Sequence, residues 1–325
     1  MRIPDIREIK NTARQRLADS ANANQVLLIY IGISFGFSLI SLLVNYFLDH
    51  QVNQFGGLGN LGIRSMLSSI GLFLPMVISL VLMCVDLGYL AAMLRAARGQ
   101  YTSPQTLRLG FDRFWSLIRC QAVQIGILFF YIFGAAYVSS LIFVLFPFSG
   151  EAIGMLSAGV PDFSGMAPSE VLPYLASMAP MFLIYFVLLA IFLIPLFYSW
   201  RLANYVIIEK PGIGGFAALR MSSQMMRGNR MALFKLDVSL WWYYLLGGLA
   251  TVLCYGDSLL PLLGISLPIP GEVAYFVFYF LYLAAQFGIL WCFRNRVEVT
   301  YGLVYDSLCP KKEETGVVLG NIFEI

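Results

Sequence analysis

Six long apolar stretches constrain what this chain can fold into more than any other feature of its sequence. They lie at residues 25–48, 66–94, 120–147, 171–200, 233–254 and 272–293. A helix needs roughly 20 apolar residues to cross the ~30 Å hydrocarbon core of a bilayer, and each stretch is long enough. The whole chain is 59% hydrophobic and 12% charged, whereas about 25% of the residues in a typical soluble domain are charged. The sequence therefore predicts an all-α, polytopic membrane protein with six transmembrane helices.

Three basic amphipathic stretches precede the first, third and fifth spans. They are predicted as helices lying at the membrane interface, at residues 4–19, 104–118 and 214–227. The second begins at Ser103-Pro104, a pair that favours a helix start. In the third, we expect Phe216, Leu219 and Met226 to face lipid. Each stretch is followed by two spans, so we predict three repeats of an amphipathic helix plus a helical hairpin.

Lys and Arg are distributed asymmetrically between the connections. Of the 21 basic residues, only Arg64 lies in a connection that follows the first, third or fifth span. Because cytoplasmic connections are rich in Lys and Arg, both termini and the three amphipathic helices are predicted on the cytoplasmic side. Residues 1–310 are predicted to form a single membrane domain, and residues 311–325 a cytoplasmic tail. No element is predicted after Arg294, where the sequence becomes polar.

Four segments carry a family resemblance. They are LRMSSQMMRGNRMALFKLDVSLWW (219–242), IPLFYSWRLANYVI (194–207), GYLAAMLRAARGQ (88–100) and the Tyr-containing segment 301–308. In these segments the chain resembles a bacterial family of six-span membrane proteins of unknown function (Domain of Unknown Function 975). The resemblance implies a six-span fold in the bacterial plasma membrane and brings no catalytic residues with it. Where members often have Pro-Gly after the fourth span, this chain has Pro195-Leu196.

Residue types argue against several kinds of chemistry. His50 is the only histidine, which argues against His-based metal sites and His-dependent catalytic dyads. The five cysteines include no CxxC pair, and most are expected to be small buried apolar side chains. No Gly-rich phosphate loop is present, and a net charge of +3 suggests no nucleic-acid partner. We therefore expect a non-enzymatic protein without a cofactor or metal.

Polar side chains within the apolar spans form a candidate polar membrane cluster. Its members are Asp86, Gln124, Asp237, Tyr275, Tyr279, Tyr282 and Gln286. The two acids and two glutamines are expected at similar depth, and the tyrosines with Gln286 fall on one helix face. An ionised acid at mid-membrane costs at least ~2.5–3.5 kcal/mol, so we expect Asp237 to pair with Arg227 or Arg230. Two roles remain open for Asp86 and the tyrosine face: structural pairing, or a transport or binding site.

Arginines of the amphipathic stretches are candidate contacts of anionic lipid. They are Arg108, Arg113, Arg220, Arg227 and Arg230. A basic residue near an anionic surface gains about 1 kcal/mol of attraction, although the same charges also determine topology. The expected partner is therefore anionic lipid of the inner leaflet, with a protein partner or homo-oligomer left open. The expected function is a lipid-contacting scaffold or accessory subunit. The alternative is a transporter of a small or amphiphilic solute that uses Asp86 and the tyrosine face.

Overall fold

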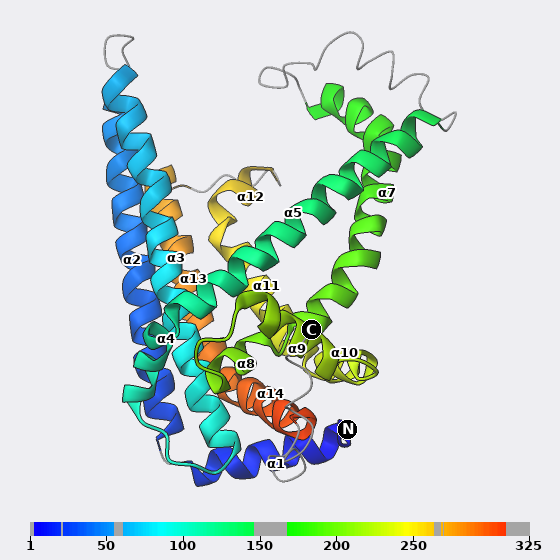
Figure 1. Cartoon of the computed structure of the whole chain (residues 1–325). Helices are drawn as coiled ribbons and strands as arrows, with labels where there is room; N and C mark the ends of the chain where they lie inside the picture. Colours follow the sequence, from blue (N-terminus) through cyan, green and yellow to red (C-terminus); the bar gives the residue numbers. More distant parts are fainter. Residues whose placement is uncertain are drawn as a thin grey trace. The chain divides into compact units, whose positions relative to one another are not determined.

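A computed structural model describes residues 3–20, 22–54, 61–145, 168–262, 268 and 270–309. Every regular element within these ranges is helical, which confirms the prediction of an all-α chain. The predicted tail, residues 311–325, lies outside them. Within these ranges five helices are long and apolar enough to cross a membrane, and a sixth span is obtained if one bent pair of helices is a single span. The helices belong to two compact units, which are described separately (Figure 1).

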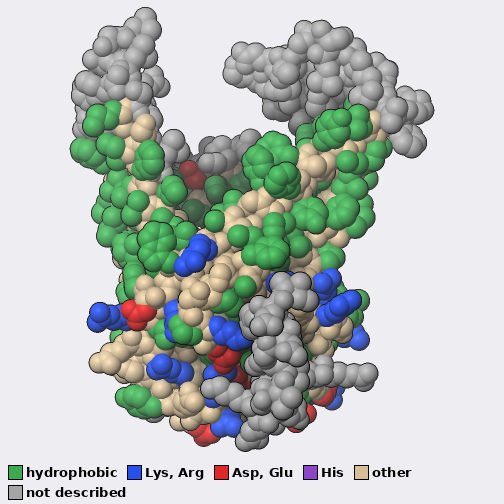
Figure 2. Space-filling view, viewed as in Figure 1, with side chains coloured by type: hydrophobic (Ala, Val, Ile, Leu, Met, Phe, Trp, Pro, Cys, Tyr) green, Lys and Arg blue, Asp and Glu red, His purple; other side chains and the backbone are tan. Residues whose placement is uncertain are grey.

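Unit 1 is formed by residues 1–117, 202–213 and 231–325. Its helices are α1 (Ile6–Asp19), α2 (Ala23–Gln54), α3 (Leu61–Ala97), η2 (Pro104–Arg108), α4 (Leu109–Asp112), α8 (Ala203–Glu209), α10 (Arg230–Ser239), α11 (Trp241–Cys254), α12 (Gly256–Leu262), α13 (Gly271–Ile289), η5 (Leu290–Arg294) and α14 (Asn295–Leu308). The η2 segment is a 3-10 turn, and η5 is π-helical. The long helices α2 and α3 pack side by side, and α11 packs against α13. Figure 2 shows hydrophobic side chains along α2 and α3, with Lys and Arg side chains near the end of unit 1 that carries α1.

The core of unit 1 lies where α1, α2, α3 and α14 meet. Leu27, Met93 and Val299 are fully buried there, each on a different helix. The predicted interfacial helix 4–19 forms α1, which packs against α14 and α3 and buries Ile9 and Ala13. The apolar side of α1 is therefore covered at these two residues by protein.

Two glycines allow α3 to lie very close to η2 and α4. A Cβ atom on Gly88 would lie 2.2 Å from the carbonyl oxygen of Leu107, and one on Gly110 would lie 1.7 Å from that of Cys84. In both cases backbone meets backbone, as in close helix contacts of membrane proteins. The predicted helix 104–118 is not one continuous helix. Its residues form η2, α4 and the first turn of the next helix in succession.

The residues of the predicted fifth span, 233–254, form a bent pair of helices. Helix α10 ends at Ser239, and α11 begins at Trp241 and runs at 62° to it. The Lys10 ammonium donates a hydrogen bond to the Ser239 carbonyl at 2.8 Å. This bond satisfies one of the carbonyl groups that every helix end leaves without an intrahelical partner.

Unit 2 contains residues 118–201 and 214–230. Its helices are α5 (Phe114–Leu145), whose first turn belongs to unit 1, α7 (Pro168–Trp200) and α9 (Gly215–Met225). A Cβ atom on Gly215 would lie 2.4 Å from the carbonyl oxygen of Arg119. The Ser222 hydroxyl is fully buried and donates to the carbonyl of Ser199 at 2.7 Å. A face of small residues on α9 thus packs against the neighbouring backbone.

The predicted lipid-facing side of α9 is only partly correct. Phe216 is 65% exposed, as expected, but Leu219 and Met226 are buried in protein. The reason is the contact between α9 and α7, which leaves a narrower apolar strip than the sequence pattern suggested.

Candidate functional site

Helix α14 organises the polar contacts of unit 1. Val297, Tyr301, Val304 and Leu308 are buried and follow each other at helical spacing, and Gly302 lies against Ala97 of α3. Helix α14 also packs against α1. Polar side chains of α14, together with Arg294 of the η5 turn before it, reach partners on α2, α3, α8 and α10. We call this set of contacts the α14 network.

The first contact of the α14 network is an ion pair between η5 and α3. The Arg294 guanidinium lies 2.5 Å from the Asp86 carboxylate, which also accepts a hydrogen bond of 3.0 Å from the Tyr30 hydroxyl. Arg294 lies over the rings of Tyr30 and Tyr89, with its central carbon 4.6 Å and 5.2 Å from their centres. A carboxylate and two aromatic faces therefore compensate a cation whose side chain is only 16% exposed.

The amide of Asn295 fixes the start of α14 between α2 and α3. Its oxygen accepts a hydrogen bond of 2.7 Å from the Tyr89 hydroxyl, and its NH₂ group donates to the Asn24 side chain at 3.0 Å. Asn295 and Tyr89 are both buried. Because an unpaired polar group would be costly there, these bonds specify the direction in which α14 leaves η5.

Asp237 meets α14 about two turns further on. It accepts a hydrogen bond from the Tyr301 hydroxyl, which lies 2.7 Å from that of Tyr244. Within unit 1 the partner of Asp237 is thus a tyrosine, whereas the expected partners, Arg227 and Arg230, belong to unit 2. The partners of the two acids, Arg294 and Tyr301, are separated by about 10 Å of helix at 1.5 Å per residue. Asp86 and Asp237 therefore contact the α14 network at two separate positions, Arg294 and Tyr301.

The last turn of α14 joins α3 and α8. Arg98 lies 2.5 Å from Asp306 and also contacts Glu209, whose carboxylate accepts a hydrogen bond of 2.7 Å from Tyr305. The hydrogen bonds to Asp306 raise the pKa of Arg98 above its ordinary value, although partial burial opposes the shift. The three charged side chains are 25–32% exposed, so solvent weakens their attraction. We infer that these contacts orient the ends of α3, α8 and α14 relative to one another.

The remaining members of the polar membrane cluster lie apart from α14. The Tyr279 hydroxyl donates to the Ser38 carbonyl on α2 at 3.1 Å, and its ring lies 6.3 Å from that of Tyr275 and 5.9 Å from that of Tyr282. Gln286 is half-buried on the same helix, α13. Gln124 belongs to α5 in unit 2, whereas the other members of the cluster belong to unit 1.

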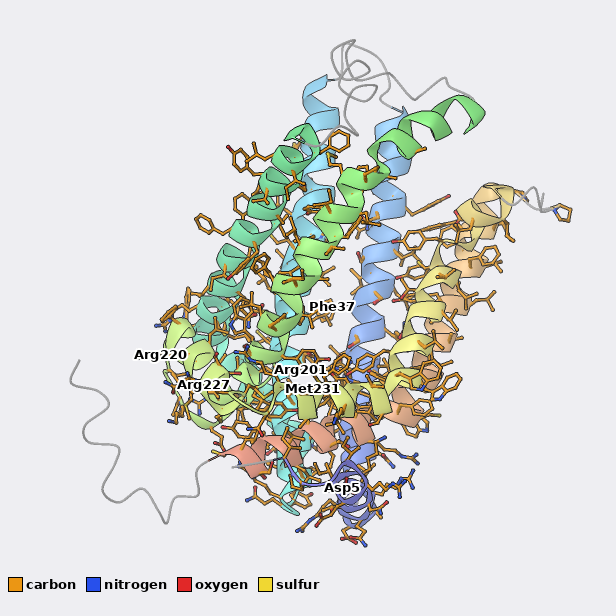
Figure 3. The ribbon with its side chains drawn as sticks, turned by 90° about the vertical axis from the view of Figure 1, so that its right-hand side faces the viewer. Asp5, Phe37, Arg201, Arg220, Arg227 and Met231 are labelled. Atoms are coloured by element: carbon orange, nitrogen blue, oxygen red, sulfur yellow. The ribbon has the colours of Figure 1, made fainter. Side chains whose placement is uncertain are left out.

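The candidate lipid-contacting arginines differ in exposure. Arg108, Arg220, Arg227 and Arg230 are exposed, whereas Arg113 is half-buried. Arg220 lies on α9, and Arg227 follows that helix directly (Figure 3). Four of the five side chains are therefore free of the protein core and accessible to a headgroup.

The chemistry available to the α14 network is hydrogen bonding and charge pairing. Among the residues that the structure describes, no group of three His, Cys, Asp or Glu side chains lies close enough to hold a metal ion. Cys84 and Cys120 are buried, as expected for small apolar side chains, whereas Cys292 is exposed.

Comparison with known proteins gives one match. Residues 3–303 match the family model described as "Protein of unknown function (DUF975)", which confirms the resemblance noted in the sequence. No curated protein and no solved structure matches the chain. Since the family model covers nearly all of the sequence outside its last residues, the chain belongs to the DUF975 family.

Proposed function

We propose that the chain is a non-enzymatic, lipid-contacting membrane scaffold or accessory subunit of the bacterial plasma membrane. The ion pair between Asp86 and Arg294 carries this proposal. An acid that binds and releases a proton or solute must exchange its partners during each cycle. Asp86 instead accepts hydrogen bonds from Tyr30 and from Arg294, and the Arg294 guanidinium is itself held over the Tyr30 ring. This arrangement favours a fixed structural role for Asp86.

The proposed topology has both termini and the amphipathic segments on the cytoplasmic side. It consists of three sequence repeats, each an amphipathic helix followed by a helical hairpin. The asymmetry of Lys and Arg along the sequence supports this orientation. Further support comes from α1, η2–α4 and α9, each of which precedes a long apolar helix or the bent α10–α11 pair. Anionic lipids of the inner leaflet are the proposed partner of the exposed arginines.

A transporter of a small or amphiphilic solute is the second candidate. The bend between α10 and α11 and the π-helical η5 segment favour it, because broken helices and π-turns recur at solute sites. Asp86 also keeps 42% of its side chain exposed, so a solute could reach it. The ion pair with Arg294 is stronger evidence than this exposure, since Asp86 is the only carboxylate with which Arg294 forms an ion pair among the described residues.

Two substitutions of Asp86 distinguish the candidates. In a scaffold, Asp86→Asn keeps an acceptor for Tyr30 and Arg294 and should cost at most about 1 kcal/mol of stability. Asp86→Leu leaves Arg294 without a carboxylate and should cost about 2–3 kcal/mol. That figure is below the ~3–5 kcal/mol of a fully buried pair because Asp86 is partly exposed. Thermal unfolding in detergent measures both, with Asp112→Asn on the exposed surface of α4 as the matched control.

A double variant completes the test. Adding Arg294→Met to Asp86→Leu should restore part of the loss, with a coupling of about 1–2 kcal/mol between the two sites. If both single Asp86 variants instead melt above the parent, Asp86 is an acid retained for activity at a cost in stability. That result would reject the scaffold in favour of the transporter.

A further inference from the structure

A basic recess lies where α1 meets the bend between α10 and α11. It is lined by Lys10 and Arg14 of α1, by Trp242 of α11, and by Phe293 and Arg296 of the η5–α14 segment, and its volume is about 200 Å³. A second recess of about 700 Å³ adjoins it and shares Arg14, Phe293 and Arg296. Neither recess has an Asp or Glu among its described lining residues.

Among the described residues, the basic side chains of this recess form no ion pair. Among the described residues, ion pairs involve Arg98 and Arg294, and neither Arg14 nor Arg296 forms one. Both are exposed, whereas Lys10 is half-buried and bonded to the Ser239 carbonyl. Burial, followed by the positive charge of Arg14, lowers the pKa of Lys10. Like charges are therefore held together here without a carboxylate partner among the described residues, a situation that a bound anion relieves.

The bent helix pair adds a further attraction for an anion. Helix α11 starts at this recess and has no side-chain cap at Leu240. Its positive dipole end therefore adds to the field of the three cations. The Lys10 bond to Ser239 meanwhile neutralises the opposite, negative end of α10.

We propose that Lys10, Arg14 and Arg296 bind a phosphate ester anion, presented by the headgroup of an anionic phospholipid. Guanidinium groups hold phosphate through paired, charge-assisted hydrogen bonds. The lipid source is favoured because Trp242 lines the first recess, Trp291 lines the second, and both are exposed. Exposed tryptophans next to basic residues at the end of apolar helices are typical of headgroup depth. The inference rests on the proposed lipid-contacting function and assigns it a site.

Binding measurements on the full chain in detergent test this site. The probes are short-chain phosphatidylglycerol, short-chain phosphatidylcholine and inorganic phosphate, with affinity read by native mass spectrometry and tryptophan fluorescence. The variant Arg14→Gln/Arg296→Gln removes two exposed charges and leaves the Lys10–Ser239 bond intact. At about 1 kcal/mol for each basic residue, it should weaken phosphatidylglycerol binding about 30-fold. The matched control, Lys210→Gln/Lys235→Gln, removes two exposed charges of unit 1 that line neither recess and should change the affinity less than twofold.

The outcomes separate the sources of the anion. Binding of phosphatidylglycerol that depends on Arg14 and Arg296, with phosphatidylcholine and inorganic phosphate inactive, supports the lipid headgroup. If inorganic phosphate binds with the same dependence and phosphatidylglycerol gains nothing over it, the lipid assignment is overturned and a soluble phosphate ester takes its place. Equal losses in variant and control, or none in either, overturn the site itself. Neither result alters the stability test at Asp86, so the two proposals can fail separately.

Discussion

Replacing Gly110 by alanine should drive α4 away from α3. The added Cβ would lie 1.7 Å from the Cys84 carbonyl oxygen, so about 1.6 Å of movement is needed to reach an ordinary C···O contact of ~3.3 Å. The obstructing atoms belong to the backbone of α3, and a Cβ on Gly88 of α3 would likewise lie only 2.2 Å from the Leu107 carbonyl oxygen. No side-chain rotation can relieve the clash. We therefore expect a loss near the upper end of overpacking costs, about 3 kcal/mol.

Gly36→Ala provides the matched control for this experiment. Gly36 lies within the long helix α2 of unit 1, and an added Cβ there meets nothing within 4 Å. Alanine there should be neutral or stabilise by up to about 1 kcal/mol through helix propensity. Thermal unfolding in detergent gives the stabilities, and maleimide labelling of Cys84, which is 1% exposed in the parent, reports opening of the crossing. Equal melting of both variants, with Cys84 still protected, would refute the close crossing of α3 and α4.

Two further predictions concern orientation and unit 2. Cysteines placed at Gln105 and Gln224, both exposed, should label only from the cytoplasmic side, and one at the exposed Pro268 only from outside; the reverse pattern would contradict the charge-based topology. Ser222→Ala removes a buried hydrogen bond to the Ser199 carbonyl and should lower the stability of the parent by about 1–2 kcal/mol in thermal unfolding, whereas an unchanged melting temperature would show that this bond contributes nothing.

The long helices were predictable because a run of apolar residues is a local property of the sequence. The predicted span 25–48 lies within α2, and the prediction 272–293 covers nearly all of α13. The bend in the predicted span 233–254 was not found, because no Gly or Pro stands between Asp237 and Trp241 to signal it. Without such a residue, the corner at Leu240 depends on tertiary contacts such as the Lys10 bond to Ser239.

The α14 network was missed for a different reason. Val297, Tyr301, Val304 and Leu308 follow at spacings of four, three and four, which is a helical signal that the intervening polar residues obscured. The sequence did single out Asp86 as an acid in need of a partner. Its partner, Arg294, is 208 residues away, and no local pattern relates two positions at that distance.

The π-helical turn η5 makes the winding of one short segment structurally critical. Each residue of an α-helix turns the chain by about 100°, and a π-turn accommodates an extra residue within an otherwise α-helical path. Winding the same five residues, Leu290–Arg294, as a regular α-helix would rotate α14 by about 100° relative to α13. Asn295 and Tyr301 would then point away from Tyr89 and Asp237, although every side chain of α14 itself would be unchanged. The π-helical winding of this turn therefore determines which face of α14 meets α1, α2 and α3.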